Sequence, residues 1–553
     1  MKSLRHVLTI AFFTLLMTLG PSCASATAAK VQDTSWLGEV RDYELPEWFT
    51  SANRVHSHTR LTSRWIDKSP FVNAGKHFGD MGFEVMTRHI VSGGEGAWWP
   101  SKVGTVLKEA KNRNFAKEII DEAHASKRRI IVYYRHMEDR GMARAHPEWL
   151  TRDPKGKPYV KRGEKLCFNT PYRDFVQTRL LELVDMGADG FYFDEKHQPE
   201  ICRCATCKAN KKTREDIIRE TFLQFRTAIH KRNPECVLLV SSQFGGLSHS
   251  MWRLPDICKF EQHIAFKYGG NGPYGLPLGF TFTRDAADGT PTHYWWSNQK
   301  TSTLYTSART LAFGHIFNFD VKESGIADPD SDFYKMARRH TALGRKLSRY
   351  LNAAPIPVRW AIIHYPEGTP QGEAKTNVVL PVFKTLATRH APIGIITNTQ
   401  LREGIPAECM LLVFPNSKHS ITKSVRVQRL LAAFKARGGV VIRGNDKTLA
   451  EKTTAARPSA PVFARAKKTQ EDYVLTAFRD KADTKLLALL SPNSAGTVLK
   501  DAILVLPKDR TPAKAIDVMT GKERPITKAA DGRFIITLPT VKLIGGASIT
   551  WKK

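Results

Sequence analysis

Eight apolar runs, each the length of a β-strand, alternate with amphipathic stretches from about residue 55 to residue 321. Alternation of this kind predicts a parallel sheet with helices packed against it. Eight such strands in a region of this length match a closed (β/α)8 barrel, which usually takes about 250 residues. The expected strands are Ser57–Thr62, Phe83–Val91, Arg129–His136, Asp189–Asp194, Cys236–Phe244, Ile257–His263, His293–Ser297 and His315–Val321.

The chain has 553 residues, too many for one core, so we expect further domains. The barrel is predicted over residues 40–352, with Asp332–Leu351 as its last helix. Residues 355–455 again alternate strands and helices, which predicts a doubly wound, flavodoxin-like α/β domain. That domain lacks G-x-G-x-x-G and a phosphate loop, so no nucleotide is assigned to it. A linker rich in Ala, Pro and Lys (Thr454–Lys468) precedes a β-sandwich predicted over residues 466–553.

The N-terminus has the pattern of a targeting segment. Two basic residues precede the apolar run Val7–Leu19, which is too short to span a bilayer, and the small residues Ala24–Ala28 follow. We therefore expect a signal peptide over residues 1–28 and a secreted or periplasmic protein. Cys23 offers lipid attachment as the alternative, although the residues before it fit a lipobox poorly. No later run reaches transmembrane length.

Two adjacent acids, Asp194 and Glu195, end the aromatic run of the expected fourth strand. Catalytic residues of a barrel lie at the C-terminal ends of its strands, and strand alternation sends one of two neighbouring side chains into the mouth. A glycosidase uses one carboxylate at the anomeric carbon and another to protonate the leaving oxygen. We predict Asp194 as the nucleophile, with capping of the next helix as its structural alternative. For the second acid we favour Glu261, at the end of the expected sixth strand, with Asp320 and Glu195 as alternatives.

A resemblance to the α-L-fucosidases rests on two segments. Residues 83–102 read FEVMTRHIVSGGEGAWWPSK and resemble the family signature, a strand ending in Lys-His-His-Asp-Gly-Phe followed by Trp-Pro-Ser-Lys. Residues 191–194, FYFD, resemble the strand that carries the family's catalytic Asp. The resemblance implies retaining hydrolysis with Asp194 as nucleophile, but the second His and the Asp-Gly-Phe, which read the hydroxyls of fucose, are replaced here. The sugar-binding candidates are His89, Trp98, Trp99, Arg135, His136 and His263.

Three cysteines, Cys202, Cys204 and Cys207, lie just beyond the fourth strand. Three thiols this close favour a soft metal, and a structural zinc needs a fourth ligand, for which Cys167 is the candidate. Both segments resemble the zinc-bearing β-galactosidases with a trimerisation domain, whose acid/base Glu lies in an Asn-Glu pair where this chain has Asp194-Glu195. This resemblance implies a structural zinc, no cofactor for catalysis, and a flavodoxin-like second domain through which a homo-oligomer could form. Two disulfides are the alternative.

The formal net charge is +31, from 84 Lys and Arg against 53 Asp and Glu. Such an excess favours an anionic partner over a neutral one, and a basic surface that serves only solubility is the alternative. No nucleic-acid motif is present, so we expect a sulfated or uronate-bearing glycan, held near Arg88, Lys102, Arg135 and Lys196. Three functions stay open: a fucosidase-like hydrolase, a β-galactosidase-like hydrolase and an inactive carbohydrate-binding barrel.

Overall fold

A computed structural model describes much of the chain beyond residue 42. The described residues are 43–59, 74–92, 96–135, 138–160, 164–194, 202–241, 252–261, 265, 269, 273–296, 303–321, 328–366, 373–415, 420–443, 448–465 and 473–552. They belong almost entirely to the unit Glu44–Lys553, and the predicted signal peptide lies outside them. No helix within these ranges combines the length and hydrophobicity that a bilayer crossing demands.

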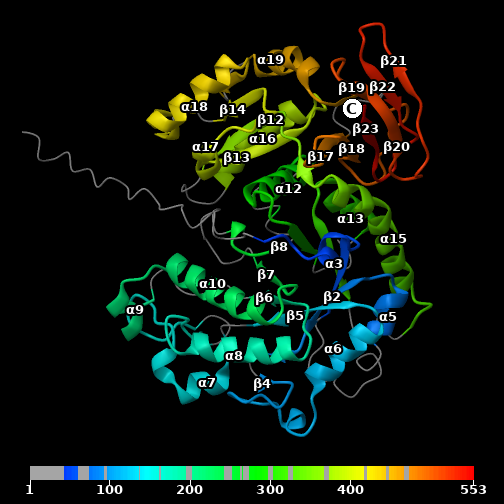
Figure 1. The fold of residues 1–553 in the computed structure, drawn as a ribbon. Coiled ribbons are helices and arrows are strands. Elements are labelled where there is room, and N and C mark those ends of the chain that lie inside the picture. Colours follow the sequence, from blue (N-terminus) through cyan, green and yellow to red (C-terminus); the bar gives the residue numbers. More distant parts are fainter. Residues whose placement is uncertain are drawn as a thin grey trace, which may run out of the picture. The chain divides into compact units, whose positions relative to one another are not determined.

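Eight parallel strands close into a barrel in the order β1-β10-β9-β8-β7-β6-β5-β2, which confirms the predicted fold (Figure 1). β1 pairs with both β10 and β2, and these two pairings complete the ring. The strands are β1 (Val55–Thr59), β2 (Val85–His89), β5 (Arg129–Tyr134), β6 (Gly190–Phe193), β7 (Val237–Ser241), β8 (Ile257–Glu261), β9 (Thr292–Trp296) and β10 (Ile316–Val321).

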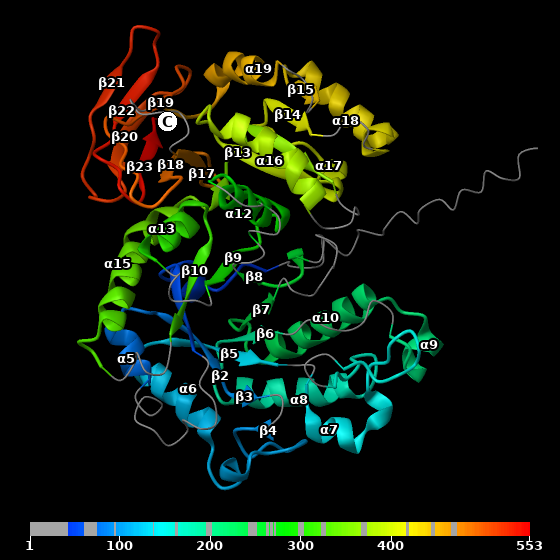
Figure 2. The ribbon, with the colours of Figure 1, turned by 180° about the vertical axis from the view of Figure 1, so that it is seen from behind.

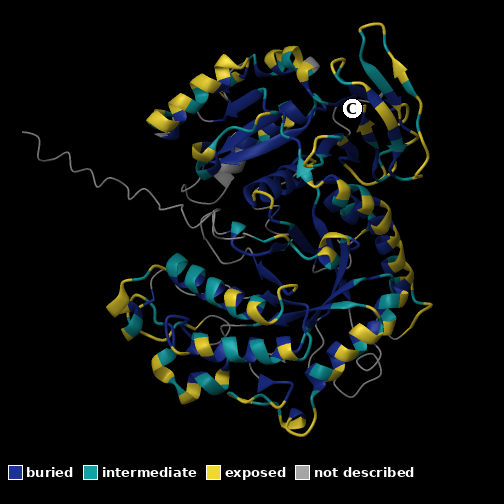
Figure 3. Cartoon of the chain, in the orientation of Figure 1, coloured by how far each residue is buried: buried dark blue, intermediate teal, exposed yellow. Residues whose placement is uncertain are grey.

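Helices surround the strands, as the views from both sides show (Figure 2). Side chains cap the starts of several of them: Thr213 and Asp216 form a capping box at α10, and the Ser331 side chain caps α15. Most of these helices have a buried face and an exposed outer face, whereas every residue of α12 is buried (Figure 3). The helices are α5 (Ala74–Asp80), α6 (Phe115–Ala125), α8 (Tyr172–Asp185), α10 (Arg214–Arg232), α12 (Gly275–Ala286), α13 (Leu304–Ala312) and α15 (Asp332–Ala353).

A second, parallel sheet has the order β13-β12-β14-β15, which is the order of a flavodoxin-like sheet, the fold expected for this domain. Its strands are β12 (Ala361–Tyr365), β13 (Ile393–Thr397), β14 (Leu411–Phe414) and β15 (Val440–Arg443), and its helices are α16 (Glu373–Ala387), α17 (Asn398–Glu403), α18 (Val425–Ala436) and α19 (Leu449–Ala456). Asp285 of α12 accepts a hydrogen bond from the backbone N–H of Ile395 (2.8 Å), so the barrel and this sheet are joined by a buried carboxylate.

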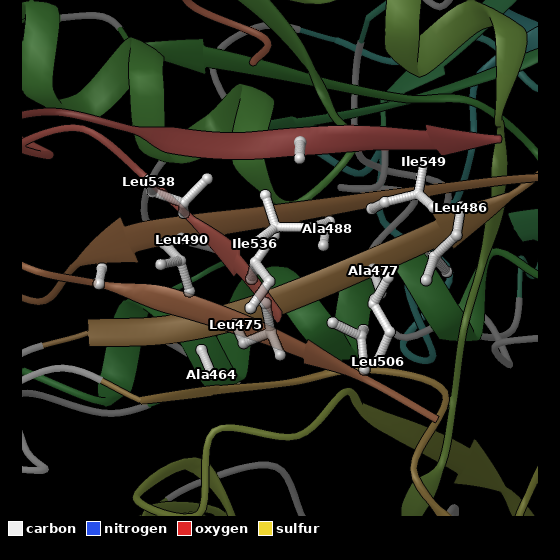
Figure 4. Close-up of a cluster of buried hydrophobic side chains, with 14 of the residues drawn as sticks. Ala464, Leu475, Ala477, Leu486, Ala488, Leu490, Leu506, Ile536, Leu538 and Ile549 are labelled. Carbon is white, nitrogen blue, oxygen red and sulfur yellow. The ribbon is translucent and has the colours of Figure 1, made fainter. Parts of the chain in front are cut away.

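Two antiparallel sheets form the C-terminal sandwich, in the orders β11-β17-β18-β23-β20 and β16-β19-β22-β21. Alternate residues of both sheets meet in one apolar core, for example Leu475, Leu490 and Ile536 (Figure 4). The strands are β11 (Ile356–Pro357), β16 (Phe463–Arg465), β17 (Tyr473–Arg479), β18 (Lys485–Pro492), β19 (Ile503–Leu506), β20 (Pro512–Asp517), β21 (Ile526–Lys528), β22 (Phe534–Thr537) and β23 (Gly545–Trp551).

The expected linker, Thr454–Lys468, is largely structured in its described part. α19 continues to Ala456, the 3₁₀ turn η6 (Arg457–Ser459) follows, and β16 pairs with β19. The short apolar run Val462–Ala464 within the expected linker is buried. The sandwich therefore begins before residue 466.

Candidate active site

Every second side chain of the barrel strands points inward. Tyr133 and Tyr192 belong to an apolar cluster with Ile257 and Ile316, inward-facing positions of four strands. The same parity directs Asp194, Glu261 and Asp320 toward the interior at the C-terminal ends of β6, β8 and β10. Asp194 and Glu261 are partly exposed, so both carboxylates are within reach of a ligand at the mouth.

Asp194 is held by a tyrosine of the neighbouring strand. The Tyr133 hydroxyl donates to Asp194 Oδ2 at 2.5 Å, and the Asp194 backbone N–H donates to the Tyr134 carbonyl at 3.3 Å. A hydrogen bond to a carboxylate is stronger than one between neutral groups, and it orients the acid. Among the described residues Asp194 caps no helix: the N-caps of α9 (Ala205–Asn210) and α10 are Cys204 and Thr213.

Three aromatic side chains at the mouth fix one another. The ring of His89 stacks on Tyr133, with centroids 3.7 Å apart and planes 5° from parallel. His58 of β1 meets both rings edge-on at 5.7 Å. His89, the predicted sugar-binding His, thus stands beside the tyrosine that holds Asp194. His58 and Tyr133 were not among the residues predicted from sequence, although their inward parity on β1 and β5 marks them.

Glu261 shares its face of β8 with a buried lysine that the sequence analysis also missed. Lys259 is 1% exposed; its Nζ lies 3.8 Å from the centre of the Tyr192 ring and 3.3 Å from His58 Nδ1. Burial, followed by the charges of Asp194 and Glu261, raises the pKa of Tyr192 well above its usual value. The charges of Asp194 on β6 and of Glu261 on β8 thus both raise the pKa of the same side chain, Tyr192.

Buried histidines line the barrel around Lys259. Burial first, and then the charges of Arg54 and Lys259, lower the pKa of His56 to about 3, so this imidazole is neutral at physiological pH. Burial and Lys259 also hold the pKa of His293 well below its usual value. In the described part of the barrel, Lys259 therefore lies near two imidazoles, His56 and His293, whose lowered pKa values favour the neutral form.

Asp320, the alternative second acid, lies on the far side of the mouth. The indole N–H of Trp295 donates to its Oδ1 at 3.4 Å, and Asp320 is in register with His58 across β10 and β1. Asp320 is 8% exposed and is less accessible than Glu261. We therefore keep Glu261 as the first candidate for the second acid.

Two of the basic residues expected at the mouth, Arg135 and Arg88, differ in where they lie. Arg135 lies directly after β5 and pairs with Glu138 at 3.4 Å, and Glu138 also forms an ion pair with the buried Lys165. Arg88 does not reach the mouth: its parity is opposite to that of His89, and it is fully buried. Burial lowers the pKa of Arg88 to about 10, and the charge of Glu122 on α6 partly opposes that shift.

The two tryptophans expected to stack on a sugar are packed inside the protein. Trp98 and Trp99 are 0% and 1% exposed, and Trp99 Nε1 donates to Glu182 of α8 at 2.7 Å. The same carboxylate accepts from the Ser101 hydroxyl (2.7 Å) and from the Lys102 backbone (2.8 Å). The Trp-Pro-Ser-Lys segment therefore anchors its loop to α8, and the prediction of a stacking role is wrong for this structure.

Four remaining candidates, Glu195, His136, His263 and Lys196, lie outside the described residues.

The four predicted zinc ligands come together as a buried group. The sulfur atoms of Cys167, Cys202, Cys204 and Cys207 all lie within 4.8 Å of one another, with Cys167 and Cys207 3.5 Å apart. Zinc–sulfur bonds of about 2.3 Å at tetrahedral angles place sulfurs about 3.8 Å apart, so the four thiols fit a zinc ion. None of the described cysteines forms a disulfide. Asn169 adds an N–H···S contact to Cys207 at 3.5 Å.

Comparisons with known proteins agree with this barrel. The family model of hypothetical glycosyl hydrolase 6 matches residues 72–195, which include β2, β5, β6 and Asp194. α-L-Fucosidase isoenzyme 2 from Paenibacillus thiaminolyticus is similar in structure, with a TM-score of 0.71 and 14% identity over 91% of this chain and 100% of that one. Gan42B, a GH42 β-galactosidase from G. stearothermophilus, is similar with a TM-score of 0.63 and 11% identity over 90% of this chain and 98% of that one.

The β-galactosidase from Rahnella sp. R3 gives a TM-score of 0.54 at 12% identity, over 89% of this chain and 98% of that one. A search of curated proteins finds no significant match. The chain therefore has the barrel fold of these glycosidases with two further domains, and its segment 72–195 matches a glycosyl hydrolase family model.

Proposed function

We propose that the protein is a retaining glycoside hydrolase that uses Asp194 as nucleophile and Glu261 as acid/base. The observation that carries the proposal is the position of Asp194. It is a partly exposed carboxylate at the C-terminal end of the fourth barrel strand, held by Tyr133 and beside the stacked His89. This is the end of a barrel at which catalytic groups lie.

In this reaction Asp194 attacks the anomeric carbon while Glu261 protonates the leaving oxygen. The resulting glycosyl ester on Asp194 is then hydrolysed by a water molecule, from which Glu261 removes the proton. The hydrogen bond from Tyr133 orients the attacking carboxylate. The Lys259 ammonium, inward-facing two residues before Glu261, contributes positive charge beneath the two acids.

An α-L-fucosidase-like specificity is our first candidate. It is supported by His89 at the mouth, by the FYFD strand, and by the similarity to the P. thiaminolyticus fucosidase. A β-galactosidase-like specificity is the second candidate, and the cysteine group and the flavodoxin-like second domain favour it.

The test is a screen of aryl α-L-fucosides and β-galactosides with the wild type, Asp194→Ala and the control Asp121→Ala. Asp121 is an exposed acid on the outer face of α6, so its loss should leave turnover unchanged. Losing the nucleophile should lower turnover by several orders of magnitude. Turnover by Asp194→Ala above about a tenth of the wild-type rate would remove Asp194 from this role, because loss of a nucleophile costs far more. Sugar binding without turnover in the wild type would favour the inactive, carbohydrate-binding alternative.

We propose in addition that Cys167, Cys202, Cys204 and Cys207 hold one structural zinc. Four thiolates leave no open position for water, so the metal would stabilise the segments around β6 and take no part in the chemistry.

We also propose export, on the evidence of the N-terminal charge and apolar pattern, and an anionic glycan as substrate. The net charge of +31 supports the latter, as does Arg135, which directly follows β5 at the C-terminal end of a barrel strand.

A further inference from the structure

Three arginines gather around one phenylalanine, remote in sequence from the barrel mouth. Arg457 lies in η6, Arg465 ends β16, and Arg533 directly precedes β22. The ring at their centre is Phe463, at the start of β16. We call these four residues the Phe463 arginine cluster.

The guanidinium groups converge on the ring at short range. Their central carbons lie 4.7 Å (Arg457), 5.4 Å (Arg465) and 5.6 Å (Arg533) from the centroid of Phe463. Each distance is within the range of a cation–π contact. The ring is 2% exposed, whereas Arg457 and Arg533 are partly exposed and Arg465 is exposed. The buried ring thus supports three cations whose N–H groups are accessible to solvent.

The β-strand pairing and one further bond assemble the cluster. β16 and β22 are the two neighbours of β19, and the backbone N–H of Ala464 donates to the His390 carbonyl at 3.0 Å. His390, next to Arg389, stacks on Tyr473 at 3.8 Å. The cluster is therefore built from defined secondary structure of both the second domain and the sandwich.

Little negative charge opposes these arginines. Arg533 Nε lies 3.6 Å from Asp531 Oδ2, but in the part of the chain that the structure describes no ion pair joins Arg457 or Arg465 to a carboxylate. Burial, and after it the charges of Arg465, Arg389 and Arg533, lower the pKa of Arg457. Burial and then the charge of Arg457 likewise lower the pKa of His390 to about 3. The cluster therefore carries a positive field that the described acids do not cancel.

Three other buried or half-buried arginines of the protein are paired with acids. Arg179 pairs with Asp139 at 2.9 Å, Arg524 with Asp517 at 2.9 Å, and Arg253 with both Glu403 and Asp288. Like charges held together without acids destabilise a fold, because each guanidinium repels the others. A bound anion would remove that repulsion.

We propose that Arg457, Arg465 and Arg533 form a noncatalytic binding site for sulfate-ester or carboxylate groups of a glycan. The planar guanidinium presents paired N–H donors that match the oxygens of either group, and such bonds are charge-assisted. That the anion is carried by a glycan rests on the proposed function, whereas anion binding at the cluster does not. The site would hold a polyanionic chain independently of the barrel mouth.

The test measures binding by full-length protein to a sulfated oligosaccharide, its desulfated counterpart, a uronic acid oligosaccharide and an oligonucleotide of equal charge. The site variant is Arg457→Gln with Arg465→Gln, and the control is Arg426→Gln with Arg429→Gln, two exposed arginines of α18. Both variants lose the same charge. We expect the site variant to weaken binding of the preferred anionic oligosaccharide by about tenfold or more, the loss of one or two charge-assisted bonds. The control should change it by less than about twofold, since exposed charges contribute little.

Equal losses in the two variants would overturn the proposal, because net charge alone would then explain binding. Equal affinity for the sulfated and desulfated forms, with none for the uronic form, would overturn it as well. The proposal would also be overturned if the oligonucleotide bound as tightly as the glycan and if Arg457→Gln with Arg465→Gln abolished that binding.

Calorimetric melting with inorganic sulfate gives a second measurement: sulfate should stabilise the wild type more than the site variant, and equal stabilisation contradicts the site. If the double variant does not fold, Arg465→Gln alone, at an exposed position, replaces it. Glycosidase activity is not used as a readout, so a protein without turnover that binds in this way would refute the proposed function and leave this inference standing.

Discussion

Replacing Tyr133 by Phe removes one hydroxyl from the candidate active site and little else. The ring remains to stack on His89 at 3.7 Å and to pack against Tyr192, so the barrel core keeps its volume. What is lost is the 2.5 Å hydrogen bond to Asp194 Oδ2. A hydrogen bond to a charged group contributes about 1.5–3 kcal/mol.

If this bond orients Asp194 for attack, its loss should lower kcat/KM by roughly 10- to 150-fold, since 1.4 kcal/mol corresponds to about a factor of ten. The assay is steady-state hydrolysis of the best aryl glycoside, with circular dichroism to show that the fold is retained. Tyr134→Phe is the matched control. Tyr134 is the next residue of β5, and its parity turns it away from the barrel interior toward Arg179.

The control should keep kcat/KM within about twofold of the wild type, because single contacts away from the reacting atoms act on stability instead. The reasoning is refuted if Tyr133→Phe keeps more than half of the wild-type activity. It is equally refuted if both variants lose activity to the same degree, since a general disturbance of β5 would then be the cause.

Three further predictions concern parts of the protein outside the chemistry. Metal analysis should find one zinc per chain, and Cys204→Ser should lose it and melt at a lower temperature; no zinc, or disulfides among the four cysteines, would contradict this. The hydrogen bond of His124 Nε2 with Asp189 (2.9 Å) raises the pKa of His124, so its contribution is fully present below the unfolded pKa of about 6.5 and is lost as pH rises through the folded value. His124→Gln should therefore destabilise more at pH 5.5 than at pH 8.5 in urea unfolding, and an equal effect at both would contradict the linkage. Glu182→Gln should lower the free energy of unfolding by about 1–3 kcal/mol, because it weakens three bonds to the loop at Trp99–Lys102, while kcat stays unchanged. A large loss of kcat would instead place that loop in the site.

The barrel could be predicted from sequence because its strands are short apolar runs at regular intervals, and each run fell on a strand of the structure. The strands β20 and β21 were not predicted, since Ala513 and Lys514 interrupt the buried residues of β20 and no residue of β21 is buried. At the mouth, acids that directly follow an apolar run, such as Asp194 and Glu261, stand out in a sequence.

Residues whose place in the site is set by strand register cannot be recognised in the sequence. Tyr133 and Tyr134 are neighbours of the same type, and only the pairing of β5 with β6 tells which one meets Asp194. A lysine such as Lys259 in a strand suggests solvent, yet it is buried against an aromatic ring inside the barrel. Arg88 was expected at the mouth because it adjoins His89 in sequence, but its side chain is buried on the side of α6.

The central claim is that Asp194 forms the covalent bond to the sugar. A 2-deoxy-2-fluoro glycosyl fluoride of the best substrate slows hydrolysis of the glycosyl–enzyme ester, so the intermediate accumulates and can be located by peptide mass mapping. The account predicts one label per chain on the peptide that contains Asp194, and no label in Asp194→Ala. A label on Glu195, Glu261 or Asp320, or turnover with inversion and no label, would contradict it.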